Sequence, residues 1–323
     1  MIYSNFLKSV VLPIADKAMG TRIVKSLRQL KSMESYSKKE IQSWQNNKLQ
    51  KLIDHAYNNT KYYKNIFDSV RVKPEDVKSI DDLNKIPKLT KRDIRENFAE
   101  IIPTNIKSIP HKMASTGGST GQPLKYYLDL HSWSFVNASK IINWEKAGHK
   151  YGEKYAALGS TSLFIDKKAP IKHRIYYGLK NKIGLNGVNM SEDVCREYIE
   201  LIKRKKIKFI YGYASSIYLL AKYVIENRLK VPIKVCFPTS EILTDHFRET
   251  IQQAFKCKIV DFYGAHDGGL VAFDHTGKGF EVTYNSILIH EGNIGNDLRP
   301  VLVTDLFNYA MPLINYDLGD LVS

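Results

Sequence analysis

Cysteine is scarce in this sequence, and long apolar runs are absent. The 323 residues include three cysteines, which lie far apart and form no Cys-x-x-Cys pair, and the nine histidines show no zinc-ligand spacing. This usage argues against a disulfide scaffold or a zinc site and favours a reducing compartment. No stretch approaches the roughly 18 apolar residues that a membrane-spanning helix needs. We therefore expect a cytoplasmic protein.

Two familiar nucleotide-binding patterns are also missing. No Gly-Lys-Ser/Thr sequence closes a Walker A loop, and there is no Gly-x-Gly-x-x-Gly turn. Instead, three glycines and three hydroxyl residues stand in a row: Thr116, Gly117, Gly118, Ser119, Thr120 and Gly121. Glycines let backbone N–H groups turn toward one point, and hydroxyls add donors, so this stretch predicts a loop that holds phosphate oxygens. A plain serine–glycine connector is the alternative interpretation.

The chain has an excess of positive charge. It contains 48 lysines and arginines against 33 aspartates and glutamates, for a net charge of +15. This excess is compatible with a polyanionic partner or with a lysine-rich solvated surface. No nucleic-acid-binding motif accompanies it, so we expect no nucleic-acid partner. The densest cluster, Lys203–Lys206 with Lys208, follows a predicted helix, where cations oppose the negative end of the helix dipole.

The first 33 residues combine apolar and basic side chains. Phe6, Leu7, Val10 and Ile14 belong to an apolar run that Lys8, Pro13 and Asp16 interrupt, and basic residues follow it. One interpretation is an amphipathic segment that makes a weak contact with an anionic membrane, at its inner face. The other is a helix packed on the body of the protein.

The rest of the chain predicts an α/β fold. Residues 1–100 read as a helical segment that packs on the body, and residues 101–323 as an α/β core within one large domain. Three strands alternate with two helices, which predicts a parallel sheet. The strands are expected at 207–211, 234–237 and 258–262, and the helices at 217–225 and 247–255, the second capped by Thr244 or Asp245. Shorter strands at 286–290, 300–306 and 312–316 suggest a smaller antiparallel sheet.

Polar side chains follow each of the three predicted parallel strands. They are Tyr213 and Ser215 after the first strand, Ser240 and Glu241 after the second, and Tyr263, His266 and Asp267 after the third. In a parallel α/β sheet, ligands bind at the carboxyl ends of the strands. We therefore expect these residues to line one crevice.

Several segments, in order along the chain, resemble the adenylate-forming (ANL) superfamily. Thr116–Pro123 is similar to its phosphate loop. Residues 49–63, 86–93, 240–244, 262–264 and 316–320 resemble further motifs of the phenylacetate-CoA ligase branch, and in particular its CapK-like members of capsular polysaccharide biosynthesis. The resemblance covers nearly the whole chain. It implies the large amino-terminal domain of the acyl-CoA synthetase fold, which uses ATP and Mg²⁺ to convert a carboxylic acid into an acyl-adenylate. The acyl group then passes to coenzyme A, a sugar or a carrier.

The resemblance also implies residue roles. The glycine loop would hold the phosphates, Tyr263 with Gly264 would bind adenine, and Asp320 would bind the ribose hydroxyls. Asp267 would hold Mg²⁺, where the family usually has glutamate, and His266 would contact the acyl group or phosphate. Ser240 and Glu241 fall in the nucleotide and substrate loops, and Tyr213 and Ser215 in the acyl pocket. Each role has a structural alternative. Tyr263 could be a tyrosine buried in the core, and Asp320 could be a turn residue beside Gly319. The loop residues Tyr213, Ser215 and Ser240 could be solvated side chains without a ligand.

The chain departs from the family in length as well as at Asp267. The family continues with a carboxyl-terminal lid domain that bears a catalytic lysine, whereas this sequence stops at Ser323. We expect it to bind ATP or AMP better than it turns ATP over. Three interpretations stay open for the lid: the sequence is a piece of a longer chain, the protein is naturally short, or a separate partner supplies the lid. Two alternatives stay open: a non-catalytic nucleotide-binding homologue and a basic peripheral membrane scaffold.

Overall fold

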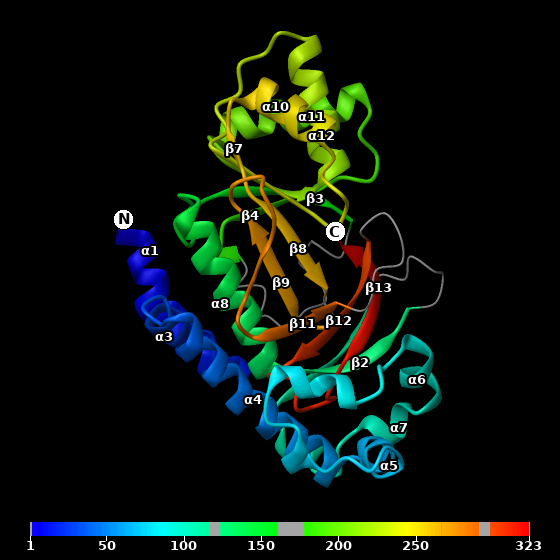
Figure 1. The fold of residues 1–323 in the computed structure, drawn as a ribbon. Helices are drawn as coiled ribbons and strands as arrows, with labels where there is room; N and C mark the ends of the chain where they lie inside the picture. Colours follow the sequence, from blue (N-terminus) through cyan, green and yellow to red (C-terminus); the bar gives the residue numbers. More distant parts are fainter. Residues whose placement is uncertain (1, 117–122, 161–177, 266, 291–297, 323) are drawn as a thin grey trace. The chain divides into compact units, whose positions relative to one another are not determined.

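The computed structural model describes residues 2–116, 123–160, 178–265, 267–290 and 298–322 (Figure 1). The chain forms two compact units. Unit 1 consists of residues 1–18, 140–264 and 272–281, and unit 2 of residues 19–139, 265–271 and 282–323. The boundary expected at residue 100 falls inside unit 2. Whether residues 1–100 fold as a segment of their own stays a prediction.

An eight-stranded sheet, largely in unit 1, confirms the predicted parallel strands. Its order is β10-β9-β8-β6-β5-β3-β4, with β7 beside β6. The pairs β3–β4, β3–β5, β5–β6, β6–β7 and β6–β8 are parallel. The strands are β3 (Tyr155–Gly159), β4 (Lys182–Asn186), β5 (Phe209–Tyr213), β6 (Val235–Thr239), β7 (Lys258–Ile259), β8 (Asp261–Ala265), β9 (Leu270–Asp274) and β10 (Glu281–Val282).

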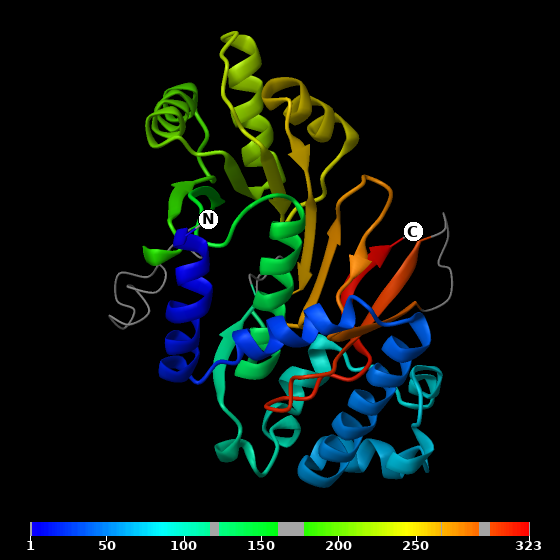
Figure 2. The same ribbon diagram turned by 90° about the vertical axis from the view of Figure 1, so that its left-hand side faces the viewer.

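Helices α10 (Glu192–Lys205), α11 (Ala214–Glu226) and α12 (Asp245–Phe255) lie together beside these strands (Figure 2). Their apolar stripes and the strand residues Ala156, Leu158, Ile210 and Cys236 form one buried core. The Thr244 side chain accepts a hydrogen bond from the Phe247 N–H, as the predicted cap of α12 requires. The basic cluster at 203–206 does end a helix, because Lys206 takes the left-handed conformation that terminates α10.

The other face of the sheet is aromatic. Helix α8 (Leu130–Lys146) runs across the unit boundary, and its carboxyl-terminal half belongs to unit 1. There Trp144 stacks on Phe237, with ring centres 4.3 Å apart, and meets Tyr155 edge-on at 5.1 Å. His149 meets Phe209 in the same way at 4.8 Å. Unit 1 is therefore a three-layer α/β/α structure with an aliphatic and an aromatic interface.

The amino terminus is helical and packs on unit 1. It consists of α1 (Ile2–Phe6), a π-helical turn (Leu7–Val11) and α2 (Leu12–Met19). Leu7 and Leu12 are buried, and Lys8 pairs with Glu145. The Tyr3 hydroxyl donates to the Leu179 carbonyl at 2.8 Å. One face of this segment is thus held against the protein, which the second interpretation of residues 1–33 predicted.

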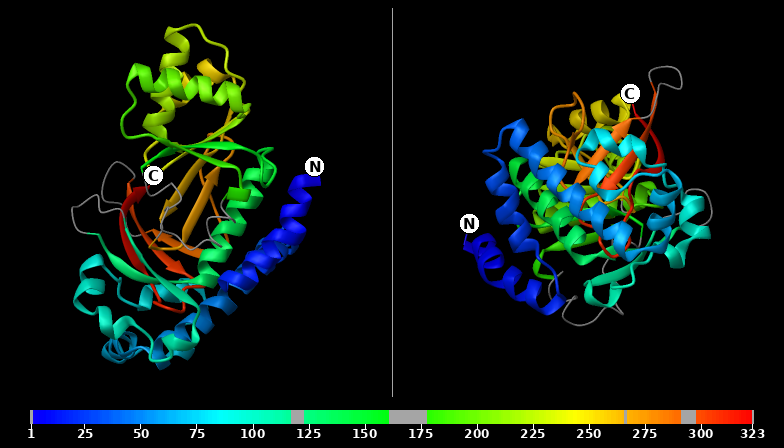
Figure 3. Two further views of the ribbon diagram at one scale, coloured as in Figure 1. Left: turned by 180° about the vertical axis from the view of Figure 1, so that it is seen from behind. Right: turned by 60° about the horizontal axis from the view of Figure 1, so that its bottom comes forward.

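Unit 2 joins helices to small antiparallel sheets (Figure 3). The predicted helical character of the first hundred residues is confirmed. The helices in unit 2 are α3 (Ile23–Met33), α4 (Lys38–Asn59), α5 (Lys61–Ser69), α6 (Lys91–Glu96) and α7 (Phe98–Ile101), with short 3₁₀ turns at 74–76, 80–85 and 106–108. Strand β1 (His111–Ser115) pairs with β2 (Lys125–Asp129), and β11 (Ser286–His290), β12 (Arg299–Asp305) and β13 (Tyr316–Val322) form the predicted antiparallel sheet.

The strand predicted at 312–316 is wrong, because the last strand begins at Tyr316. Residues 312–315 are buried and irregular, and long-range hydrogen bonds hold them in place. The Tyr63 hydroxyl donates to the Pro312 carbonyl at 2.9 Å and accepts from the Ile314 N–H at 3.0 Å. Asn315 has a positive φ of 50°, and its side chain donates to two carbonyls of residues 83–86. These partners lie over 200 residues away in sequence, so local periodicity could not reveal them.

Candidate functional site

Three adjacent strand ends of unit 1 are linked by hydrogen bonds. The Tyr213 hydroxyl, at the end of β5, donates to Ser160 Oγ just after β3 at 2.8 Å. The Ser215 N–H donates to Glu241 Oε2 just after β6 at 2.8 Å. Ser240 has a φ of 67°, in the left-handed region that marks a sharp turn at this strand end. The structure thus brings Tyr213, Ser215 and Glu241 to the same edge of the sheet.

Tyr263 and Gly264 lie within β8, which ends three residues beyond the strand predicted at 258–262. The Tyr263 side chain is half-buried, and its ring centre is 6.0 Å from that of Phe280. It is therefore not enclosed in the core in the way that Tyr63 or Tyr126 is. A half-buried aromatic ring near the end of a parallel strand is suited to stacking against a planar ligand.

Asp267 is buried in unit 2 and held by one tyrosine. The Tyr316 hydroxyl donates to Asp267 Oδ2 at 2.7 Å. Burial, followed by the nearby Asp267 carboxylate, raises the pKa of Tyr316, so this tyrosine stays a hydrogen-bond donor at every physiological pH. The Tyr126 hydroxyl has no hydrogen-bond partner within the described part of the chain. Burial and the carboxylates of Asp267 and Asp305 raise its pKa as well.

Asp305 is another buried acid of this region, at the end of β12. The Ser132 hydroxyl donates to Asp305 Oδ2 at 2.5 Å, and the Phe307 N–H donates to Oδ1 at 3.0 Å. A Cβ atom added at Gly269 would overlap the carboxylate, so only glycine fits there. Burial is the main cause that raises the pKa of Asp305 to about 7.

This raised pKa predicts a stability loss at neutral pH. The folded state holds the Asp305 proton more tightly than the unfolded chain does, so stability is greatest below pH 4 for this group and falls as pH rises toward 7. The loss is at most about 4 kcal/mol, from a shift of roughly three units at 1.4 kcal/mol each. Asp305→Asn should remove this dependence in urea unfolding at pH 5 and pH 8. The exposed Glu249→Gln is the control; if Asp305→Asn keeps the wild-type pH slope, the assignment is wrong.

The carboxyl-terminal strand runs beside the segment that precedes α6. The Leu89 N–H donates to the Asn315 carbonyl at 3.0 Å, and the Asp317 N–H donates to the Leu89 carbonyl at 2.9 Å. The Lys91 ammonium donates to the Leu318 carbonyl at 2.8 Å. Asp320 is exposed on β13. Two of the segments that carry the family resemblance, 86–93 and 316–320, are therefore direct neighbours, a contact that the sequence did not predict.

The glycine-rich stretch lies mostly outside the described residues. Its first residue, Thr116, is described: the Thr116 N–H donates to the Leu124 carbonyl at 3.0 Å, and Thr116 Oγ1 accepts from the Leu124 N–H at 2.9 Å. These two bonds close the base of the connection between β1 and β2. The roles of Gly117, Gly118, Ser119, Thr120, Gly121 and His266, which all lie outside the described residues, stay predictions.

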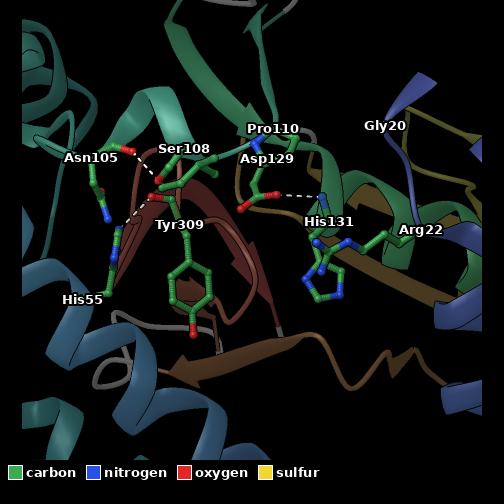
Figure 4. A pocket seen from close by; sticks show the side chains of 10 residues that line it. Gly20, Arg22, His55, Asn105, Ser108, Pro110, Asp129, His131 and Tyr309 are labelled. Atoms are coloured by element: carbon green, nitrogen blue, oxygen red, sulfur yellow. Dashed lines mark hydrogen bonds between the residues drawn. The ribbon is translucent and has the colours of Figure 1, made fainter. Parts of the chain in front are cut away.

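A polar cavity of about 300 Å³ in unit 2 was missed by sequence reasoning (Figure 4). It is lined by Gly20, Arg22, His55, Asn105, Ser108, Ile109, Pro110, Asp129, His131 and Tyr309. Asp129 Oδ1 accepts from the His131 N–H at 2.7 Å, and burial raises the pKa of Asp129 to about 6. Burial, then the charge of Arg22, lowers the pKa of His131 to about 4. None of the residues predicted for the site lines this cavity, whose walls come from segments without a shared motif.

The sequence has relatives among known proteins, although no family model matches it. Protein CapK from Staphylococcus aureus is 25% identical over 282 residues, which cover 86% of this chain and 62% of that protein. The phenylacetate-coenzyme A ligase from Aromatoleum evansii is 26% identical over 319 residues, which cover 90% of this chain and 68% of that ligase. The chain is a homologue of CapK and of the phenylacetate-coenzyme A ligases.

The fold of the chain matches that of solved acyl-CoA ligases, as the resemblance predicted. A 2-hydroxyisobutyryl-CoA ligase in the postadenylation state, with R3-HIB-AMP, superposes with a TM-score of 0.67 at 16% identity and covers 89% of this chain and 64% of the ligase. An open form with 2-HIB-AMP and CoA gives a TM-score of 0.64 at 17% identity, covering 85% of this chain and 68% of the ligase. The chain spans 62% of the length of CapK.

Proposed function

We propose that this protein binds ATP and AMP and activates a carboxylic acid as an acyl-adenylate, for transfer to coenzyme A, a sugar or a carrier. The observation that carries the proposal is the alignment of 90% of the chain with a phenylacetate-coenzyme A ligase. The shared fold with a ligase solved with an acyl-AMP supports it. A role in capsular polysaccharide synthesis is the finer part of the proposal and rests on the relation to CapK.

In this proposal the predicted residues hold two anions, the substrate carboxylate and the triphosphate of ATP, close to each other. The carboxylate is a poor nucleophile toward a negatively charged triphosphate, so donors must neutralise charge and hold the reactants in line. The loop from Thr116 to Gly121 holds the phosphates, Tyr263 and Gly264 bind adenine, and Asp320 accepts from the ribose hydroxyls. The acid lies by the strand ends of Tyr213, Ser215, Ser240 and Glu241, with His266 near its reacting end.

The residues present are compatible with a magnesium ion. Mg²⁺ is commonly held by one or two carboxylates, waters and the phosphates of the substrate, without a full protein cage. Among the described residues no group of three or more His, Cys, Asp or Glu side chains could hold a metal. Asp267 can supply the single carboxylate that such a site needs. The Tyr316 hydroxyl orients this carboxylate through Oδ2. The ion would supply positive charge at the phosphates.

The test is a reaction with ATP, Mg²⁺ and a panel of carboxylic acids, with pyrophosphate release and mass spectrometry of acyl-adenylates as readouts. We expect release that depends on the acid, and its loss in Asp267→Asn while AMP still binds. If AMP binds and no acid gives pyrophosphate, the non-catalytic alternative is correct. If neither AMP nor any acid binds the folded protein, the proposal is wrong.

A second candidate function is attachment to an anionic membrane surface through unit 1. Four apolar side chains of the amino-terminal helices recur every four residues and point outward: Ile2, Phe6, Val10 and Ile14 are 89%, 49%, 43% and 64% exposed. This spacing places them along one face of a helix. The described helices include none that is long and apolar enough to cross a membrane. The exposed stripe supports a contact with a membrane surface.

A basic cavity of about 320 Å³ lies at the same edge of the sheet as this stripe. It is lined by Glu153, Lys154, Arg204, Lys205, Lys206, Lys208 and Phe209, so five cations face a single acid. Gly152, next to this lining, lies against Leu7 and Tyr3 of the amino-terminal helices. Both features adjoin the starts of β3 and β5, at the edge opposite the strand ends of the candidate site. Apolar side chains beside a cationic hollow suit anionic lipid headgroups.

Sedimentation with liposomes tests this second candidate. We expect binding to vesicles rich in phosphatidylglycerol and none to phosphatidylcholine. A triple variant tests the basic cavity. We expect the affinity for these vesicles to fall about 100-fold when Gln replaces Lys205, Lys206 and Lys208 together, because each cation near the surface contributes roughly 1 kcal/mol. Exchanging Ile2, Phe6, Val10 and Ile14 for Gln should also weaken it. The control removes equal charge elsewhere, at Lys38, Lys39 and Lys64. Equal loss in the control, or no loss in either variant, contradicts the proposal.

A further inference from the structure

Lys140 lies in a cage of three aromatic rings in unit 1. Its ammonium nitrogen is 3.6 Å from the ring centre of Tyr211, 4.7 Å from that of Trp144 and 5.5 Å from that of Phe262. The rings come from β5, α8 and β8, so three elements converge on one lysine. Aromatic faces attract a cation, which accounts for part of the stabilisation of this charge.

The cage offers hydrogen-bond donors without acceptors. An ammonium has three N–H donors, and ring faces supply no lone pairs for them. Within the described part of the chain, the buried Trp144 Nε1–H has no acceptor, and the side chain of Lys140 is half-buried. Lys180 and Lys182 add positive charge nearby. Burial, followed by these lysines, holds the pKa of Lys140 well below its usual value. A ligand that brings negative charge would offset the cost of holding a cation among these rings and beside two further lysines.

The cage lies directly below the strand ends of the candidate site. Tyr211 precedes Tyr213, the last residue of β5, by two positions and points to the same face of the sheet. Phe262 pairs in register with Thr239, the last residue of β6. A hydrogen bond joins the Tyr211 hydroxyl to the Thr239 side chain. A group bound at the strand ends would therefore reach Lys140 with its far end.

We propose that Lys140 binds a second acidic group of the carboxylic acid substrate, at the end remote from the carboxylate that is activated. The substrate class is then a dicarboxylic acid or another doubly anionic acid, and Lys140 determines the specificity for it. This inference rests on the proposed function, whose acid lies at these strand ends. A cationic ligand is excluded in the cage by the charge of Lys140 itself.

The experiment compares acids that differ by one carboxylate. Hexanoate is paired with adipate, and phenylacetate with 4-carboxyphenylacetate, in calorimetric titrations without nucleotide and in acid-dependent pyrophosphate release. We expect the wild type to favour the second member of at least one pair by about 10- to 100-fold, the range for a hydrogen bond between charged groups. Lys140→Met should lose this preference and keep the affinity for the monoacid. Lys140→Arg should retain part of it.

A stability measurement keeps the test interpretable. A folded-state pKa below the ordinary lysine value means that the unfolded chain binds the proton more tightly, so the wild type should gain stability as pH rises from 7 to 10. Lys140→Met should be more stable than the wild type at pH 7 and lose this gain. Lys146→Met, on the same helix, should leave both the pH profile and the acid preference unchanged.

The outcomes separate this inference from the proposed function. If monoacids and AMP bind but the second carboxylate adds no affinity, the proposed function stands and the role of Lys140 is wrong. If a diacid binds directly and Lys140→Met abolishes that binding while no acid yields pyrophosphate, the subsite stands and the ligase activity fails. Equal diacid preference in the wild type and in Lys140→Met also overturns the inference.

Discussion

Gly212→Ala is expected to destabilise unit 1 by about 3 kcal/mol or more, or to prevent its folding. Gly212 lies in β5 beside Leu158 of β3, in parallel register. A Cβ atom at this position would overlap the backbone carbonyl of Leu158. Backbone atoms cannot rotate away as a side chain can, so relief would require β3 and β5 to separate. Because both strands lie inside the sheet, their separation would disrupt the core on both faces.

The measurement is urea unfolding followed by circular dichroism and tryptophan fluorescence. Gly178→Ala is the matched control, since a Cβ atom there would meet no atom within 4 Å. It should unfold at nearly the wild-type urea concentration. Equal midpoints for the two alanine variants would show that β3 and β5 do not approach each other as closely as described.

Tyr263→Ala and Asp320→Ala are each expected to lower the affinity for ATP and AMP by about 10- to 100-fold. Stacking of a base on an aromatic ring contributes about 1–3 kcal/mol, and a hydrogen bond to a charged group contributes a similar amount. Both losses should be equal for ATP and AMP, because adenine and ribose are common to them. Thr120→Ala should instead weaken ATP more than AMP, since the proposed loop holds the phosphates that leave.

Competition against a fluorescent adenine nucleotide measures these affinities. The exposed Glu249→Ala serves as the control for loss of a surface acid and should bind as the wild type does. Unchanged affinity in both Tyr263→Ala and Asp320→Ala would mean that the resemblance at 262–264 and 316–320 is not accompanied by nucleotide binding there.

The parallel strands of unit 1 were predictable because their signals are local. Apolar runs such as Phe209–Tyr211 and Val235–Phe237 end at turn residues and alternate with helical stripes, so length and periodicity define each element. The same reasoning placed the cap of α12 at Thr244 or Asp245, and the structure has Thr244 in this position. It failed at 312–316, where Tyr63 and Asn315 supply long-range hydrogen bonds to an irregular buried segment.

The candidate site was predictable only in part, for a related reason. Tyr213, Ser215 and Glu241 follow strands, and topology alone brings strand ends together. The pairing of residue 89 with the start of β13 crosses more than 200 residues and leaves no local trace. The Lys140 cage and the cavity of Arg22 and Asp129 are equally hidden. A lysine within a helix normally reads as a solvated side chain, and the cavity is assembled from segments that share no motif.

Isothermal titration of the purified protein with AMP is the most direct test of nucleotide binding. We expect saturable binding of one AMP per chain, competed by ATP and weakened in Asp320→Ala. The absence of any saturable heat up to millimolar AMP, with a circular dichroism spectrum that shows a folded α/β protein, would contradict it.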